Sequence, residues 1–135
     1  MTSIRRGGRL VTTAGVAERD GAYFLARRKV GGAQSGRWEF PGGKCDRSDG
    51  VEARCLKREF QEEFEVDIDV HEELGAVPFD HGAVRYLLVA FRITFLTEPT
   101  TLLEHTDSGW FTPVELRALD LADSDRTLVE TVLLR

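Results

Sequence analysis

The chain has no excess of positive charge, few cysteines and no long hydrophobic run. It carries 18 Lys and Arg against 23 Asp and Glu, a formal net charge of −5, whereas binding along a nucleic-acid backbone needs a basic field. No apolar stretch is long enough to cross a membrane, and the basic residues 1–8 lack the following apolar segment of a signal peptide. We therefore expect a cytoplasmic protein that binds neither nucleic acid nor membrane.

The length and the cysteine count limit the architecture. A chain of 135 residues suits one domain, so we expect residues 1–135 to form it, with 1–8 as a loose end or the lead into a strand. Cys45 and Cys55 form no C-x-x-C pattern, and we expect no disulfide framework.

Strand and helix signals alternate along the chain. Residues 10–17 and 23–26 read as a hairpin joined by Asp20-Gly21, and residues 38–40 as a short strand ended by Pro41-Gly42-Gly43. Further strand-like segments are residues 66–70, 74–79, 84–95 and 110–111. The sequence therefore predicts an α/β (α+β) fold, with a mixed β-sheet sandwiched between helices.

Three helices are expected. Asp49 and Glu52 form a capping-box pattern before a helix that runs from Val51 to about Phe64. Its apolar stripe has helical spacing and consists of Val51, Cys55, Leu56, Phe60 and Phe64. A second helix starts at Thr112-Pro113, and a third near Asp123 or Ser124. Residues 98–109 are expected to form a loop.

The first of these helices carries a cluster of carboxylates. Glu59, Glu62 and Glu63 lie three and four residues apart, so they share one side of the helix. Such a cluster is often only a solvated surface. Here it follows a strand, a glycine turn and a capped helix start, and an all-oxygen donor set suits Mg²⁺, with Mn²⁺ as a substitute, and not zinc.

Two segments carry a family resemblance. Residues 38–44 (WEFPGGK) and 58–63 (REFQEE) resemble the two halves of the Nudix box, G-x5-E-x7-R-E-U-x-E-E-x-G-U, in which U is apolar. The likeness is greatest to MutT-like members and extends over nearly the whole chain. It implies the Nudix fold and a hydrolase that splits a nucleoside di- or triphosphate at its pyrophosphate linkage.

The chain departs from this box in three places. Fourteen residues separate Gly43 from Arg58 where the motif has thirteen, so one residue is inserted. Asp49 stands nearest to the first Glu of the box and either replaces it or only caps the helix. Glu65 occupies the position of the last Gly, which normally supplies a left-handed turn, so we expect strain there or a different helix end.

The resemblance implies roles for individual residues. Glu59, Glu62 and Glu63 would bind the metal together with the carbonyl of Gly42, and Arg58 would orient a neighbouring carboxylate. Lys44 would support the glutamates or contact phosphate, and Arg28 resembles a residue that binds substrate phosphate.

The resemblance also suggests which residue acts as the catalytic base and which residue selects the nucleobase of the substrate. Glu104, six residues before Trp110, is the first candidate for the catalytic base or a further ligand. His105 competes because histidine titrates near neutral pH, although a loop histidine is more often exposed and idle. Asp125 falls where MutT-like members select the nucleobase. The alternative is that Asp125, as an acid in the first turn of a helix, interacts only with the helix dipole.

The expected reaction is the attack of water on a bridging phosphorus, which releases a nucleoside monophosphate and pyrophosphate from a triphosphate such as 8-oxo-dGTP or a CTP-like nucleotide. ADP-ribose and dinucleoside polyphosphates remain alternative substrates. A catalytically weak nucleotide sensor, or an interaction domain whose carboxylates are only solvated, remain alternative functions. The resemblance leaves a monomer and a homodimer open.

Overall fold

The computed structural model describes residues 3–32 and 34–134. The strands are β1 (Arg5–Arg6), β2 (Arg9–Val16), β3 (Glu18–Arg19), β4 (Ala22–Arg28), β5 (Trp38–Glu39), β6 (Ile68–His81), β7 (Val84–Phe95) and β8 (His105–Phe111). The helices are η1 (Arg47–Asp49), α1 (Glu52–Phe64), α2 (Pro113–Ala118), α3 (Asp123–Leu128) and η2 (Val129–Leu133), which continues α3 as a π-helical turn.

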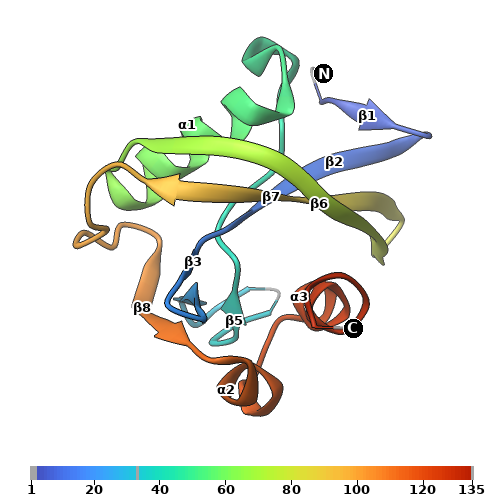
Figure 1. Ribbon diagram of the computed structural model, residues 1–135. Helices are drawn as coiled ribbons and strands as arrows, with labels where there is room; N and C mark the ends of the chain where they lie inside the picture. Colours follow the sequence, from blue (N-terminus) through green and yellow to red (C-terminus); the bar gives the residue numbers. More distant parts are fainter. Residues whose placement is uncertain (1–2, 33, 135) are drawn as a thin grey trace.

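A mixed sheet lies between two helices. Its order is β1-β2-β7-β6, with β2 and β7 parallel and the other pairs antiparallel. In Figure 1, α1 covers one face of this sheet and α3 the other. The predicted α+β fold with a sheet sandwiched between helices is confirmed.

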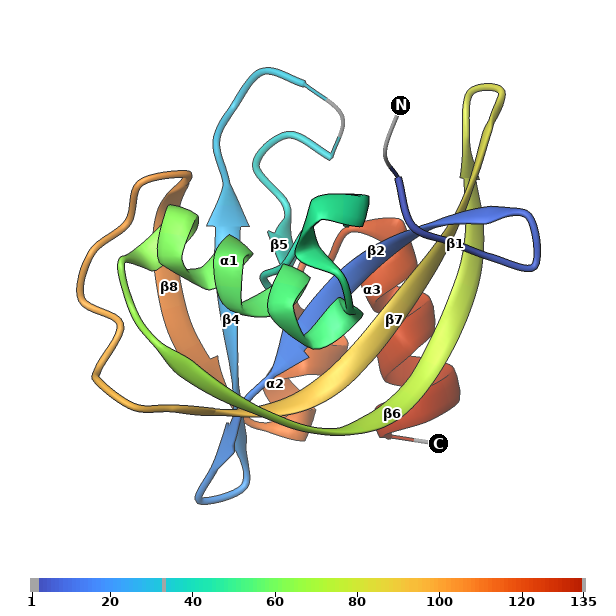
Figure 2. The ribbon, with the colours of Figure 1, turned by 90° about the horizontal axis from the view of Figure 1, so that it is seen from above.

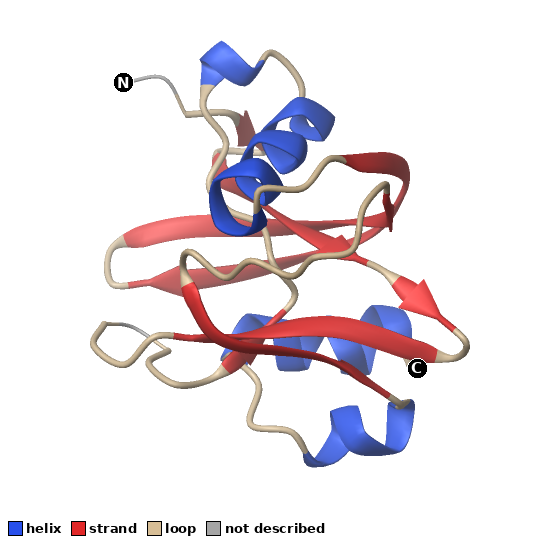
Figure 3. Ribbon diagram, turned by 90° about the vertical axis from the view of Figure 1, so that its left-hand side faces the viewer, coloured by secondary structure: helices blue, strands red, loops and turns tan. Residues whose placement is uncertain are grey.

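A second, antiparallel sheet packs beside the first. It joins β3, β4 and β5, and β8 pairs with the other edge of β4. Figure 3 shows the two sheets as separate layers, and in Figure 2 the molecule is seen from the side of α1, with β4 behind it. This arrangement brings the ends of β4, β5 and β8 toward the carboxylates of α1.

Helix α1 is held by its apolar face. Cys55, Leu56, Phe60 and Phe64 are buried, as the helical spacing predicts. The Phe60 ring lies so close to β2 that a Cβ on Gly15 would come within 2.6 Å of it. This close contact fixes where the helix sits on the sheet.

The start of α1 differs from the prediction. The N-cap is Val51, which makes no side-chain cap and is 59% exposed, so it does not belong to the buried stripe. Asp49 instead lies in η1, where it closes a capping box with Asp46. The inserted residue makes room for this separate turn, and Glu52 binds Arg6.

The end of α1 shows what replaces the expected glycine. Glu65 adopts the left-handed conformation, with φ 55° and ψ 40°, and its amide donates to the Gln61 carbonyl. The helix therefore ends as a glycine would end it, and the expected strain is present because a side chain disfavours this region.

Other local predictions held in part. Asp20-Gly21 forms the expected tight turn with both φ angles positive, but the strand paired with β4 across it is the short β3, because β2 belongs to the other sheet. Thr112 caps α2 with Glu115. The two strands expected within residues 66–79 are one long strand, β6, interrupted by bulges. Arg5–Arg6 pairs with β2, which agrees with the expected lead into a strand. The loop expected over residues 98–109 is shorter, because β8 begins at His105.

The two cysteines form a disulfide, contrary to the prediction. Cys45 and Cys55 have Cα atoms 5.3 Å apart, because the loop after the glycine turn folds back over the first turns of α1. Sequence spacing alone could not show this approach. Within the described residues, no helix has the length and apolar composition required to cross a membrane.

Candidate active site

Three carboxylates of α1 lie on one face of the helix. The exposed fractions of their side chains are 16% for Glu59, 55% for Glu62 and 9% for Glu63. Phe60 and Phe64 anchor the neighbouring side of the helix in the core. The apolar face therefore turns Glu59 and Glu63 inward while Glu62 stays at the rim.

Burial and mutual repulsion disfavour negative charge in this cluster. Burial raises the pKa of Glu59 to about 7, although Arg58 acts in the opposite direction. Burial, followed by the charges of Glu39, Glu59 and Glu104, raises the pKa of Glu63 to about 10. A divalent cation would relieve both effects, and an oxygen-rich donor set is what Mg²⁺ and Mn²⁺ prefer, so the residues fit such an ion.

The glycine turn meets the carboxylates without room for a side chain. A Cβ on Gly43 would lie 1.6 Å from the Glu59 carboxylate, and a Cβ on Gly42 would lie 2.0 Å from the Thr13 carbonyl oxygen. The carbonyls of Pro41 and Gly43 accept hydrogen bonds from β2. Because successive carbonyls of an extended segment alternate, the Gly42 carbonyl points away from β2 and can serve as a ligand.

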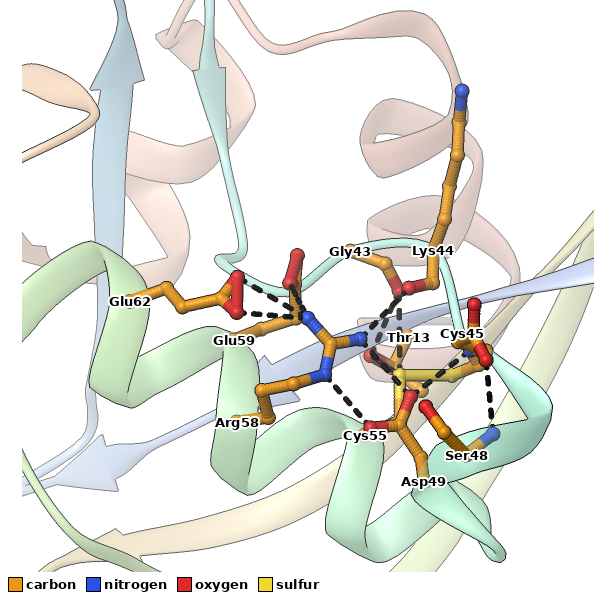
Figure 4. A network of polar contacts seen from close by, with 11 residues as sticks. Thr13, Gly43, Lys44, Cys45, Ser48, Asp49, Cys55, Arg58, Glu59 and Glu62 are labelled. Atoms are coloured by element: carbon orange, nitrogen blue, oxygen red, sulfur yellow. Dashed lines mark hydrogen bonds and ion pairs between the residues drawn. A yellow bond between two sulfur atoms is a disulfide. The ribbon is translucent and has the colours of Figure 1, made fainter. Parts of the chain in front are cut away.

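Arg58 organises the carboxylates from the side (Figure 4). Its Nη1 donates to Glu59 at 2.9 Å and to Glu62 at 3.1 Å, and its Nη2 donates to the Lys44 carbonyl at 3.2 Å. The Nε and Nη2 groups also bind Asp49. This geometry matches the expected orienting role, and Asp49 supports Arg58 as well as capping η1.

A cavity of about 680 Å³ opens beside the cluster. The structure brings nearly every residue expected at the site to this cavity; the lining includes Arg28, Gly42, Lys44, Glu59, Glu62, Glu63, Glu104 and Asp125. Arg58 stands behind the carboxylates and does not line the cavity. Residues from both sheets, α1 and α3 thus converge on one site.

The Lys44 side chain extends away from Glu59 and Glu62 (Figure 4). Its Nζ lies 5.4 Å from the centre of the Tyr86 ring, which stacks on Phe79 at 5.1 Å. All three residues line the cavity. This position favours contact with a ligand in the cavity over support of the glutamates.

Asp125 lines the cavity and is buried, with 5% exposure. Its Oδ1 accepts a hydrogen bond from the Phe40 amide at 2.9 Å. Burial raises the pKa of Asp125 to about 8, and the charge of Glu39 adds to this effect. A simple helix-dipole role does not explain a buried carboxyl that lines the cavity.

The surroundings of His105 correct the expectation of an idle loop histidine. The residue begins β8, its side chain is 2% exposed, and its Nε2 lies 2.8 Å from Oε2 of Glu39. Glu104, beside it, is exposed and lines the cavity. Long-range strand pairing buries His105, which a sequence window cannot reveal.

Glu39 is a site residue that the sequence analysis missed. It binds Arg28 at 2.9 Å and His105 at 2.8 Å. Its one signal in the sequence is a charged residue between Trp38 and Phe40 in a short aromatic strand. Glu39, Glu63 and His105 each offer a ligand atom within 4.8 Å of the others.

Known proteins share this arrangement. The chain is 31% identical over 117 residues to the CTP pyrophosphohydrolase of Escherichia coli K12, which covers 87% of this chain and 86% of that protein. It is 29% identical over 119 residues to the putative 8-oxo-dGTP diphosphatase 2 of Mycobacterium tuberculosis H37Rv, over 86% and 82% of the two chains. The MutT NUDIX hydrolase of Burkholderia pseudomallei superposes with a TM-score of 0.77 at 27% identity, over 90% of this chain and 96% of that chain.

The family comparison covers nearly the same extent. The NUDIX domain family model matches residues 8–132, which include the strands β2 to β8, α1 with its carboxylates, and the residues that line the cavity. The chain therefore belongs to the NUDIX domain family.

Proposed function

We propose that the protein hydrolyses a nucleoside triphosphate to a nucleoside monophosphate and pyrophosphate in the presence of Mg²⁺, which Mn²⁺ can replace. The observation that carries this proposal is the position of Glu59 and Glu63 at the floor of a cavity whose rim bears Arg28 and Lys44. Carboxylates that would hold a cation and basic groups that would meet phosphate thus line the same cavity.

Different residues of the chain have different roles in this reaction. Glu59, Glu62, Glu63 and the Gly42 carbonyl hold the cation, and Arg58 keeps Glu59 and Glu62 in place. A cation held by these residues would neutralise phosphate oxygens and lower the pKa of a water molecule. Glu104, at the exposed edge of the cavity, accepts the proton of the attacking water.

Arg28 and Lys44 bind the phosphates, and the opposite part of the cavity holds the base. Asp125, with one oxygen engaged by the Phe40 amide, presents its other oxygen to a hydrogen-bonding edge of the base. The names of the relatives, CTP pyrophosphohydrolase and putative 8-oxo-dGTP diphosphatase, make CTP-like nucleotides and 8-oxo-dGTP the first candidates.

The proposal includes a location and a state of assembly. We expect one domain that acts in the cytosol as a monomer or homodimer on a free nucleotide, without nucleic acid or membrane. The net charge of −5 supports the exclusion of nucleic acid because a polyanion would be repelled.

Release of pyrophosphate from a panel of nucleoside triphosphates tests the proposal, with Mg²⁺ and then Mn²⁺. The panel includes CTP, dCTP, dGTP and 8-oxo-dGTP, and adds ADP-ribose and a dinucleoside polyphosphate. Glu62→Gln should abolish turnover, because it removes a charge from the cluster, while Glu130→Gln, at an exposed position of η2, should leave it unchanged.

The alternative function is a nucleotide sensor. The inserted residue and Glu65 favour it, because both depart from the Nudix box beside the helix that carries the carboxylates. Binding of a nucleotide without turnover by the native protein would support the sensor. Turnover that is equal in the native protein and in Glu62→Gln would overturn the proposed site.

A further inference from the structure

Three strands and one helix bring four charged or polar side chains together. Glu39 on β5 and His105 on β8 flank β4, which ends at Arg28, and Glu63 approaches from α1. The pairing of β4 with β8 shifts register between Arg27 and Arg28, so that Arg28 faces His105. Such irregularities re-aim side chains near functional sites.

Both oxygens of the Glu39 carboxylate are engaged. Arg28 Nη1 donates to Oε1 at 2.9 Å, and His105 Nε2 lies 2.8 Å from Oε2. The same Nε2 is 3.7 Å from Oε1 of Glu63. Glu39 is therefore held between the Arg28 guanidinium at one carboxylate oxygen and the His105 imidazole at the other.

The His105 ring is itself held rigidly. It stacks on Phe64 with ring centres 5.3 Å apart and planes within 8°, and its side chain is 2% exposed. Its Nδ1 is buried and has no hydrogen-bond partner among the described residues. An unpaired buried polar atom costs about 1–3 kcal/mol, so packing alone would be better served by an apolar side chain.

We propose that His105 is a positioning residue for nucleotide binding, acting through Glu39 on Arg28. The stacked imidazole holds Glu39, and Glu39 holds the guanidinium of Arg28 at the rim of the cavity, where it meets substrate phosphate. The inference rests on the proposed function, because it requires a phosphorylated ligand in this cavity. It assigns to Glu39 and His105 a role on the phosphate side and not as ligands of the cation.

The test separates nucleotide binding from cation binding. The affinity for an α,β-methylene nucleoside triphosphate, which resists cleavage, is measured by calorimetry, and Mn²⁺ affinity is measured by electron paramagnetic resonance. His105→Leu should weaken binding of the analogue about tenfold, because a displaced Arg28 loses its aligned contact. Its Mn²⁺ affinity should stay within about twofold, since the carboxylates of α1 are untouched.

Steady-state kinetics and matched variants complete the test. His105→Leu should raise KM and change kcat little, since the lost contact binds the ground state and the transition state alike. His105→Gln, which restores a donor near Glu39, should recover part of the affinity. His71→Leu, which removes an exposed histidine on β6, should change nothing.

A double variant tests whether His105 acts through Glu39. Glu39→Gln should weaken analogue binding to a similar extent, and the double variant with His105→Leu should be no weaker than either single variant. Thermal unfolding checks that each variant remains folded. Additive losses in the double variant, or unchanged analogue binding in folded His105→Leu, would overturn the positioning role.

Two further outcomes keep the inference and the proposed function apart. A tenfold loss of Mn²⁺ affinity in His105→Leu would make His105 a metal ligand and overturn the inference, while the hydrolase proposal would stand. Binding of the analogue that depends on His105 in a protein without turnover would overturn the hydrolase proposal and support the inference.

Discussion

Arg58 Nε lies 2.7 Å from Oδ1 of Asp49, and the same guanidinium donates to Glu59 through Nη1. The Asp49 side chain is 5% exposed, so this ion pair is largely shielded from solvent. One arginine therefore connects the inserted turn before α1 to a carboxylate of the candidate metal site. Asp49, the residue nearest to the first Glu of the Nudix box, thus supports Arg58 in spite of the inserted residue.

Asp49→Asn should destabilise the protein at neutral pH by about 1–3 kcal/mol, because Arg58 loses a buried charged partner. The Arg58 hydrogen bond is the largest cause that lowers the pKa of Asp49 below 3.8. A lowered carboxyl pKa contributes stability that is present above 3.8 and is lost as the pH falls through the folded-state value. Urea unfolding of the metal-free protein should therefore show a difference at pH 7 that disappears in strong acid.

The control for this variant is Asp69→Asn, which changes an exposed aspartate of β6. It should alter stability by less than about 0.5 kcal/mol. A deficit of Asp49→Asn that is constant from acid to neutral pH would show that the cap of η1, and not the ion pair with Arg58, carries the effect.

Glu65→Gly should raise stability by about 1 kcal/mol. Glu65 has φ 55° and ψ 40°, a left-handed conformation that costs a residue with a side chain about 1–2 kcal/mol, while glycine loses more entropy on folding and so recovers only part of this. The gain should appear as a rise in Tm of about 3 °C in thermal unfolding. Glu65→Ala, which keeps the Cβ, should show no such gain.

Reduction of the Cys45–Cys55 disulfide should lower stability by about 3 kcal/mol, the loop-closure entropy of a segment of this length. The two residues are 10 apart in sequence. Thermal unfolding with and without a dithiol reductant measures the change, and titration of free thiols confirms reduction. The Cys45→Ser/Cys55→Ser double variant should match the reduced protein and ignore the reductant.

The same disulfide bears on location. Disulfides are rare in a reducing cytosol, so thiol labelling in intact cells together with fractionation tests the cytosolic proposal. A fully oxidised pair in a non-cytosolic fraction would contradict that location.

An unchanged Tm after complete reduction would show that the bond adds no stability to the folded chain.

Local signals predicted much of this structure. The spacing of Phe60 and Phe64 and the capping box of Thr112 are encoded within a few residues, and both were confirmed. The carboxylates of α1 were placed on one face by helical geometry alone. Local signals were not always sufficient, because the capping box expected of Asp49 and Glu52 did not form and Asp49 caps η1 with Asp46.

Contacts between distant segments could not be predicted in this way. Glu39 and His105 are 66 residues apart and meet only because β5 and β8 both pair with β4. The approach of Cys45 to Cys55 depends on how an inserted loop folds over α1. In each case the deciding partner is supplied by tertiary packing, so residue type and spacing gave no sufficient signal.

Asp125 offers a test of the cavity that depends on pH. Burial raises its pKa from 3.8 to about 8, so its contribution to stability is greatest below 3.8 and is lost as the pH rises through 8. Asp125→Asn keeps an oxygen for the Phe40 amide and removes this dependence. The variant should therefore gain stability over the native protein as the pH rises, by roughly a few kcal/mol near pH 8, in urea unfolding of the metal-free proteins. Asp123→Asn, at an exposed position of the same helix, should show no such trend, and parallel native and Asp125→Asn profiles would place an ionised Asp125 in the folded protein.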